Sequence, residues 1–179
     1  MRWLLLILAI SFPVFGWAQS ALPDRARTPG AINPAVTPAT IADTICVRGW
    51  TQQVRPPVSY TEPLKKAQIR AFGYADRRPW KYEEDHLIPL DLGGSPSSPL
   101  NLWPERHLGP DQWGAFAKDR LEAVMVRLVC RHRVGLRRAQ SIMARNWIEG
   151  YRRYIGPTPD NSRPHRWRSA WNGSGDHRW

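Results

Sequence analysis

The residues with the clearest chemical potential lie close together near the middle of the chain. Asp85 and His86 are adjacent, a Gly-Gly pair follows them, and Asn101 comes after that pair. A carboxylate suits a hard cation such as Mg²⁺, and an imidazole can accept a proton from water near neutral pH. Together these side chains are the parts of a metal-assisted hydrolase. Either Glu83 or Glu84 could orient a metal ligand without binding the metal itself. Each is equally well interpreted as an ordinary exposed acid of a strand.

Two strands must bring these groups together. Residues 80–90 and 100–103 have the composition of short strands, and Pro89 and Pro104 are expected to end them. Because neighbouring side chains of a strand point to opposite faces, the adjacent acid and histidine can share a site only where the strand twists or ends. Taken alone, the acid is better interpreted as a turn cap and the histidine as a core residue. Their combination with the Gly-Gly loop and the asparagine favours a site.

Three helices complete the predicted α+β fold. The first is expected to start at a cap on Thr61 and to end at Gly73. Apolar residues then recur at three- and four-residue spacing over residues 111–130 and again over 136–154, which predicts two amphipathic helices. Gly135 separates these two helices, so a helical hairpin packed on the strand pair is the expected core.

The charge of the chain points to an anionic partner. Its 179 residues include 26 Lys and Arg against 15 Asp and Glu, which gives a formal net charge of +11. Nucleic acid, anionic lipid and cell-wall polymer are the candidate partners. The length suits one domain, and a count of 2 Cys excludes a disulfide-dense scaffold. A single long apolar run excludes a polytopic membrane protein.

Residues 1–18 have the pattern of a secretory signal peptide. A short basic start precedes the apolar run, and small residues stand at the positions that define a cleavage site. Cleavage is expected between Ala18 and Gln19, which would leave no membrane span and place the protein in the periplasm or outside the cell. An uncleaved membrane anchor is the alternative, although the run is short for a span and contains Pro13.

Export changes the interpretation of the two cysteines. Outside the cytosol, Cys46 and Cys130 are expected to form one disulfide, with a stabilisation on the order of 4 kcal/mol in the chain-entropy model. A metal site and a reactive thiol are the alternatives, but the chain has no C-x-x-C pair, so a zinc ribbon is unsupported. Residues 41–50, which carry the first cysteine, are mildly strand-like or helical.

Composition divides the rest of the chain into a linker, one domain and a tail. Residues 19–40 are rich in Pro, Ala and Thr and are expected to form an extended linker. Residues 41–155 hold the predicted domain. Residues 156–179 are polar, basic and aperiodic, and are expected to be disordered. The tryptophans of this tail suit stacking on single-stranded nucleic acid, and its composition equally suits a solubilising role.

The strings DHLIPLDLGG and NLWPE resemble the HNH endonucleases, whose metal site is built on a ββα unit. More narrowly, the chain is similar to a group of secreted bacterial HNH-type proteins over about residues 41–151. The likeness includes the Thr-Ile-Cys start, the Lys-Asp-x-Leu-Glu helix and the Ala-Gln…Asn-Trp ending. It implies an α+β fold with a small ββα-metal hairpin-helix core and additional helices. The zinc-binding Cys pairs that brace many HNH domains are absent from this chain.

The resemblance also implies roles for individual residues. His86 would be the general base that takes a proton from the attacking water, Asp85 would hold a divalent metal, and Asn101 would tie the loop together. The third family position is a His or Asn early in the helix, and this chain has neither there. Asp119 is favoured in that place, with His107 as the rival. Mg²⁺ is the expected metal, with Mn²⁺, Zn²⁺ or Ni²⁺ as alternatives.

The arginines around the predicted helices are candidates for phosphate contacts. Those singled out are Arg106, Arg120, Arg131 and Arg133. Arginines on a helix usually form a solvent-exposed face. The high density of arginines after Cys130 supports contact with DNA about as strongly as it supports such an exposed face.

Together these features predict a secreted, metal-dependent nuclease that cuts DNA, with RNA left open as a substrate. No recognition helix or repeated readout module is evident, so cleavage is expected to be sequence-nonspecific. Two alternatives stay open. One is an HNH-like module that binds DNA without cutting it, and the other is an envelope-associated protein whose charge binds anionic polymers. A serine hydrolase is disfavoured because the chain has no G-x-S-x-G.

Overall fold

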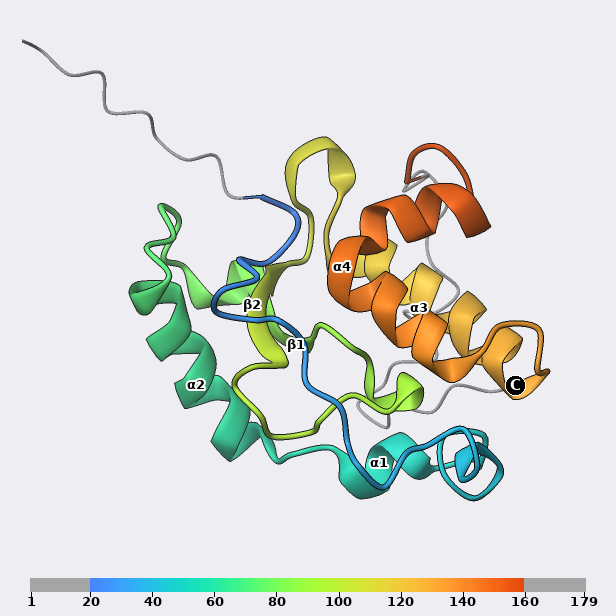
Figure 1. Cartoon of the computed structure of the whole chain (residues 1–179). Helices are drawn as coiled ribbons and strands as arrows, with labels where there is room; N and C mark the ends of the chain where they lie inside the picture. The colour runs from blue at the N-terminus through green and yellow to red at the C-terminus, as the bar shows by residue number, and fades with distance from the viewer. Residues whose placement is uncertain (1–19, 160–179) are drawn as a thin grey trace, which may run out of the picture.

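The computed structural model describes residues 20–159 and has an α+β architecture, with a two-stranded antiparallel sheet packed against helices (Figure 1). The predicted signal peptide over residues 1–18 and the predicted tail beyond residue 159 lie outside the described residues. Four short 3-10 helices, η1 to η4, accompany the helices and strands. In chain order the elements are η1 (Ile41–Asp43), α1 (Trp50–Val54), α2 (Val58–Ala71), η2 (Pro79–Lys81), β1 (Tyr82–His86), η3 (Leu90–Leu92), β2 (Leu102–Arg106), η4 (Pro110–Gln112), α3 (Ala115–Cys130) and α4 (Leu136–Tyr154).

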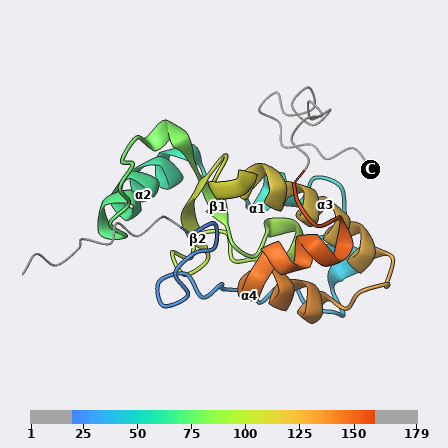
Figure 2. The ribbon, with the colours of Figure 1, turned by 90° about the horizontal axis from the view of Figure 1, so that it is seen from above.

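The hairpin of β1 and β2 lies at the centre of the fold, with α2 on one side and the pair α3 and α4 on the other (Figure 2). β1 is shorter than the strand predicted over residues 80–90, because η2 precedes it and the chain turns away after His86. The prediction that Pro104 ends the second strand is wrong, since this residue pairs with Glu84 inside β2. A two-stranded sheet leaves each strand one free edge, where a residue without an N–H is tolerated.

Helix α2 covers one face of the hairpin. It begins directly after Pro57, whose fixed φ of −68° suits the N-cap position, so the predicted cap on Thr61 is wrong. Gly73 follows the end of the helix as predicted, in the left-handed conformation with a φ of 72°. The Gln68 side chain donates a hydrogen bond to the Leu102 carbonyl at 3.1 Å, which ties the helix to β2.

Helices α3 and α4 form the predicted helical hairpin. Their bounds agree with the prediction except at the start of α3, which the sequence places at residue 111 and the structure at Ala115. Asp111 and Gln112 have positive φ angles of 51° and 66°, and a backbone in this region cannot continue an α-helix. Buried side chains from both helices, among them Leu121 and Trp147, form the main hydrophobic core.

The last helix, α4, consists of two helical segments that meet at Asn146. The φ and ψ of this residue are −163° and 84°, well outside the helical region. Its side-chain oxygen accepts a hydrogen bond from the Glu149 N–H at 3.1 Å, so it caps the second segment. The N-x-x-E spacing is a sequence signal for such a cap. The apolar spacing of residues 136–154 continues through it and therefore predicts one uninterrupted helix.

Residues 20–40, which the sequence predicts as an extended linker, contain no helix and run against the loop between the two strands. The Gly30 N–H donates a hydrogen bond to the Leu100 carbonyl at 2.9 Å. Val36 is 3% exposed and belongs to the hydrophobic core. This segment is therefore packed on the hairpin and contributes to the core.

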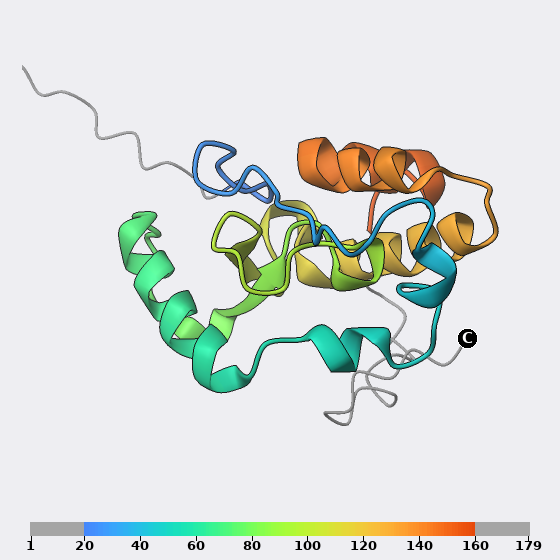
Figure 3. The same ribbon diagram turned by 60° about the horizontal axis from the view of Figure 1, so that its bottom comes forward.

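The predicted disulfide between Cys46 and Cys130 is present, with a Cα–Cα separation of 5.6 Å. It joins the segment between η1 and α1 to the last residue of α3, and Figure 3 shows this segment beside the end of that helix. The bond therefore fixes the end of α3 that lies far from the hairpin. Among residues 20–159, no helix has the length and apolar character needed to cross a membrane.

Candidate active site

The loop between β1 and β2 is held by one buried asparagine. The Asn101 Oδ1 accepts a hydrogen bond from the Ile88 N–H at 2.9 Å. Its Nδ2 donates to the carbonyls of Ile88 and Ser95, both at 3.0 Å. The side chain is 0% exposed, so water cannot replace these bonds if they are lost. Asn101 thus closes the loop on itself directly after His86.

The Gly-Gly pair is explained by the same loop. Gly93 has a φ of 75°, a left-handed conformation that glycine adopts without strain. A Cβ on Gly94 would overlap the carbonyl oxygen of Ile88 and approach the amide of Asn101, so no larger residue fits there. These two glycines let the loop fold tightly enough to bring its next residues against the end of β1.

The imidazole of His86 is buried under this loop, with an exposed fraction of 4% for the residue. Its Nε2 lies 2.9 Å from the carbonyl oxygen of Pro96. A carbonyl can only accept, so Nε2 carries the proton and Nδ1 keeps the basic lone pair. Burial, with smaller contributions from the positive charges of Arg55 and Lys118, lowers the pKa of His86 to about 4, although Asp85 opposes this effect. The imidazole is therefore neutral at pH 7.

The carboxylate of Asp85 lies on the opposite face of β1, as strand alternation requires, and it is bound by a lysine from α3. The Lys118 Nζ is 2.5 Å from Asp85 Oδ2 and 2.8 Å from the carbonyl oxygen of His86. Lys118 is 0% exposed. Burial favours the neutral acid, but the ammonium of Lys118 and hydrogen bonds from Glu105 and Lys118 outweigh it and lower the pKa of Asp85 to about 2.

Glu105 on β2 lies on the same face of the hairpin as Asp85. The register pairs Glu105 with Glu83, cross-strand neighbours point to the same side, and Glu83 and Asp85 are two residues apart on β1. Glu105 is 1% exposed, and no N–H or hydroxyl of the described chain donates to either of its oxygens. Burial and the negative charge of Asp85 raise the pKa of Glu105 well above its usual range. Protonated Glu105 can donate to the Asp85 carboxylate, which makes the two acids a buried carboxyl pair.

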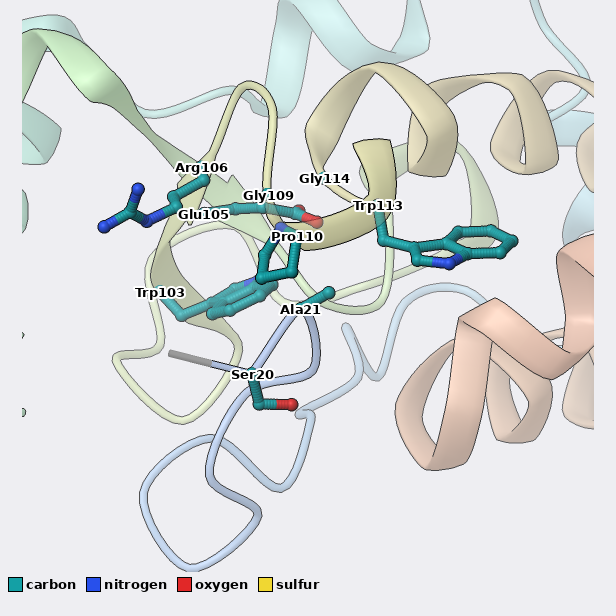
Figure 4. A pocket seen from close by; sticks show the side chains of 9 residues that line it. All are labelled: Ser20, Ala21, Trp103, Glu105, Arg106, Gly109, Pro110, Trp113 and Gly114. Atoms are coloured by element: carbon teal, nitrogen blue, oxygen red, sulfur yellow. The ribbon is translucent and has the colours of Figure 1, made fainter. Parts of the chain in front are cut away.

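A small pocket borders Glu105 on the side of the loop that precedes α3. Figure 4 shows Trp103 and Glu105 from β2 beside Gly109 and Pro110, with Ala21 and Ser20 on the N-terminal segment nearby, while the Arg106 side chain points away. The pocket volume of ≈ 10 Å³ has room for about one water molecule. The Nε1 of Trp103, another residue that lines the pocket, is also buried without an acceptor among the described residues.

A second pair of acids, Asp91 and Glu122, also lies near Lys118. Asp91 of η3 is 3% exposed, and within the described chain neither of its oxygens receives a hydrogen bond from an N–H or hydroxyl group. Burial, the charge of Glu122 on α3 and a hydrogen bond with that residue raise the pKa of Asp91 well above its usual range. The acids of β1, β2, η3 and α3 therefore gather around one buried ammonium.

The remaining predicted site residues lie at the margin of this cluster. Glu83 is partly exposed, and burial together with the charge of Asp85 raises its pKa to about 8. The two candidates for the third metal position are His107 and Asp119. His107 lies 3.7 Å from Glu83, measured from Nδ1 to Oε2, and stacks on the Phe116 ring. Asp119 is an exposed residue of α3 beside the buried lysine.

The predicted phosphate-binding arginines do not form one surface. Arg131 and Arg133 are exposed in the turn between α3 and α4. Arg120 is partly buried and donates to the Tyr151 hydroxyl at 3.3 Å. Arg106 lies over the ring of Tyr82, with 5.3 Å between the guanidinium carbon and the ring centre. Along α3, the distance from the acid cluster to the exposed turn is roughly 18 Å at 1.5 Å per residue.

The fit of a divalent cation rests on the carboxyl pair. Within residues 20–159, no group of three or more His, Cys, Asp or Glu side chains is arranged to hold a metal ion. Mg²⁺ needs fewer protein ligands, because one or two carboxylates hold it together with water and substrate phosphates. Asp85 and Glu105 offer such a pair, and the oxygens of Glu105 are buried without a donor from the described chain. An all-oxygen donor set suits Mg²⁺ or Mn²⁺ better than Zn²⁺.

Comparison of the chain with models of protein families, with curated proteins and with solved structures finds no match. The assignment of a function therefore depends on the geometry of the site.

Two residues at the centre of the cluster, Lys118 and Glu105, were missing from the predicted site. A signal for the first is its spacing from Glu122, because residues four apart lie on one face of a helix. A signal for Glu105 is the alternation of side chains along β2. It places Glu105 on the same face as Trp103, which is the cross-strand partner of Asp85. Neither signal shows that α3 delivers an ammonium to the hairpin, since that depends on how the helix packs.

Proposed function

We propose that this protein hydrolyses phosphodiester bonds of nucleic acids with the help of a divalent metal ion, outside the cytoplasm. The observation that carries the proposal is the neutral, buried imidazole of His86, which the Pro96 carbonyl fixes at the end of β1, one residue after Asp85 of the Asp85–Glu105 carboxyl pair. A fixed neutral base and a carboxyl pair that can hold a divalent cation are the groups that metal-assisted hydrolysis of a phosphodiester uses.

The general base is His86. Its Nε2–H donates to the loop carbonyl, so its Nδ1 is the atom that accepts a proton from the attacking water. A pKa near 4 keeps this nitrogen unprotonated over the whole neutral range, although it also makes the base weak. Asn101 acts on the reaction indirectly, because it holds the loop whose carbonyl orients the imidazole.

Asp85 and Glu105 are the residues that would hold the metal ion. When bound, the ion would neutralise the charge that develops on the phosphate and on the leaving oxygen. Ionisation of Glu105 must accompany its use as a ligand, because its proton occupies the oxygen that would bind. Metal affinity should therefore rise with pH.

The substrate class follows from charge. The chain carries a net charge of +11, and Arg131 and Arg133 are exposed on the turn that ends α3. Contacts of arginines with phosphates give affinity without base readout, so cleavage should not depend on sequence. DNA is the proposed substrate, and RNA has the same backbone charge. The Cys46–Cys130 disulfide and the predicted signal peptide support a periplasmic or secreted location.

A binding module without cutting activity is the second candidate, and the ammonium of Lys118 favours it. In the structure this group is the cation that occupies Asp85. A protein that used Lys118 permanently in this way would hold nucleic acid through its arginines, and chelation of metals would not affect it.

Cleavage of supercoiled plasmid by the mature chain from Gln19 tests the proposal. We expect nicking with Mg²⁺ or Mn²⁺, no nicking with EDTA, and a loss of at least 10²-fold in His86→Ala, in line with removal of a general base. Glu84→Gln serves as the matched control, because Glu84 lies one residue from Asp85 on the other face of β1. A salt-sensitive gel shift without nicking under any metal would overturn the nuclease and support the binding module.

A further inference from the structure

We propose that Lys118 is a resident counter-ion that a divalent cation must displace from Asp85, so that this side chain sets the affinity of the site for metal. The inference rests on the proposed metal site but concerns a different residue. It predicts a competition between two cations for one carboxylate.

The contacts of Lys118 give it the position of a bound cation. Its Nζ is fully buried and lies 2.5 Å from Asp85 Oδ2 and 2.8 Å from the carbonyl oxygen of His86. An ammonium is a compact point charge, and burial without compensation would be costly. Asp85 contributes most of that compensation and Glu122 adds to it, since their charges raise the pKa of Lys118 against the effect of burial. The lysine is thus held by Asp85, an acid that would hold the metal.

A divalent cation and this ammonium cannot share the carboxylate as it stands. Mg²⁺ binds carboxylate oxygens at about 2.0–2.1 Å, which would bring two positive charges within a few ångströms of each other in a buried site. Repulsion at that separation must move Lys118 away from Asp85. Glu122 lies one turn further along α3 and already acts on Lys118 electrostatically, so the ammonium has a second acid to turn to.

A purely structural ion pair would behave differently. If Lys118 only locked α3 to β1, its removal would loosen the carboxyl pair and weaken metal binding. If it competes with the metal, its removal leaves two adjacent acids without their cation and strengthens metal binding. The direction of the change in affinity therefore separates the two roles.

The first test labels amines in the intact wild-type protein. Acetylation of lysines by an amine-reactive ester, with and without saturating Mn²⁺, is read by mass spectrometry of the Lys118 peptide. We expect labelling of Lys118 to rise at least fivefold with Mn²⁺, because the displaced amine becomes accessible. Exposed Lys66 on α2 is the control and should not change. Equal labelling of Lys118 in the presence of bound Mn²⁺ would overturn the inference.

The second test measures Mn²⁺ binding alone by calorimetry and by electron paramagnetic resonance, in wild type, Lys118→Met and Asp85→Asn. We expect Lys118→Met to bind at least tenfold more tightly than wild type and Asp85→Asn to lose binding. Weaker or unchanged binding in Lys118→Met, or no binding in either protein, would overturn the inference. Should Lys118→Met fail to fold, the labelling of the wild type decides.

These readouts separate the inference from the proposed function. Tighter binding by Lys118→Met together with an uncleaved plasmid would keep the competition and reject the nuclease. Metal-dependent cleavage that needs His86, with no gain in affinity in Lys118→Met, would keep the nuclease and reject the competition.

Discussion

The two faces of the β1–β2 hairpin bury the same kinds of side chain and use them differently. Each face has one buried lysine from a neighbouring helix and at least one glutamate whose oxygens lack a donor within the described chain. On the α2 side these are Lys65 and Glu84. On the α3 side they are Lys118 and Glu105. The comparison shows that a buried charge does not by itself mark a functional site.

The partners of the two lysines make the difference. Lys65 pairs with Glu62 at 2.5 Å, three residues earlier on its own helix, and the Glu62 side chain is 41% exposed. Lys118 pairs with Asp85 on the hairpin, and the side chains are 0% and 16% exposed. The first pair is local and half in water, so it contributes little to specificity. The second joins two elements that are far apart in the sequence and gathers acids of the hairpin and of α3 around one buried ammonium.

Removal of the buried lysine should therefore cost much more stability on the α3 side of the hairpin than on the α2 side, and this is the largest effect that we expect. Without metal, Lys118→Met should lower the free energy of unfolding by about 3–5 kcal/mol, because it leaves buried acids without their cation. Lys65→Met should cost about 1 kcal/mol, as expected for a half-exposed pair. Urea denaturation of both variants measures the difference. Equal losses would show that the two faces are equivalent.

The loop asparagine tests the candidate site without a change of charge, because it holds the loop that orients His86. Asn101→Ala should lower the free energy of unfolding by about 2–4 kcal/mol, since it breaks three hydrogen bonds, two of them buried, and leaves their backbone partners unpaired. Plasmid cleavage should fall more than tenfold as His86 loses its fixed orientation. Full activity in a folded Asn101→Ala protein would contradict the positioning role.

On the α2 side of the hairpin, Glu84 should make the stability of the protein depend on pH. Burial and the charge of Asp85 raise the pKa of Glu84 from 4.5 to about 8. A raised carboxyl pKa means that the folded state keeps its proton while the unfolded state ionises, so the contribution of Glu84 to stability is lost as pH rises from 4.5 to 8.

Glu84→Gln does not titrate, and its melting temperature should exceed that of wild type by a margin that grows from pH 5 to pH 8. A gain of a few degrees is expected for a change on the order of 1–2 kcal/mol. Glu149→Gln on the exposed surface of α4 is the control and should show no such trend. A margin that stays constant with pH would contradict the raised pKa of Glu84.

The smallest effects concern the exposed turn after α3. In a His86→Ala background, Arg131→Ser and Arg133→Ser should each weaken binding to duplex DNA two- to fivefold. Each should also reduce the slope of log affinity against log salt by about one. Fluorescence anisotropy over a salt series measures both quantities. Arg77→Ser, in the connection after α2, is the charge-matched control, and an equal effect there would show that only total charge matters.

Local patterns predicted the helical hairpin and the disulfide well, because both depend on signals within the chain. The bounds of α4 follow from apolar spacing, and Cys46 and Cys130 needed only the inference of export. The start of α3 could not be predicted in this way, since the left-handed residues Asp111 and Gln112 interrupt a pattern that otherwise continues.

The candidate site was predictable only in its local part. Asp85, His86 and Asn101 stand within one hairpin, and Asn101 bonds to the backbone of Ile88, two residues after His86. The contact between Lys118 and Asp85 depends on the angle at which α3 meets the hairpin, which no spacing encodes. The protonation of Glu105 depends on that same packing, because burial is its main cause.

The most direct test of this account compares the two buried glutamates in one assay. Plasmid cleavage with Mn²⁺ is measured for Glu105→Gln and Glu84→Gln, two isosteric changes on opposite faces of the hairpin, after circular dichroism has shown that both variants are folded. The account predicts that Glu105→Gln loses at least 10²-fold in rate while Glu84→Gln stays within twofold of wild type. Full activity in Glu105→Gln, or an equal loss in both variants, would contradict it.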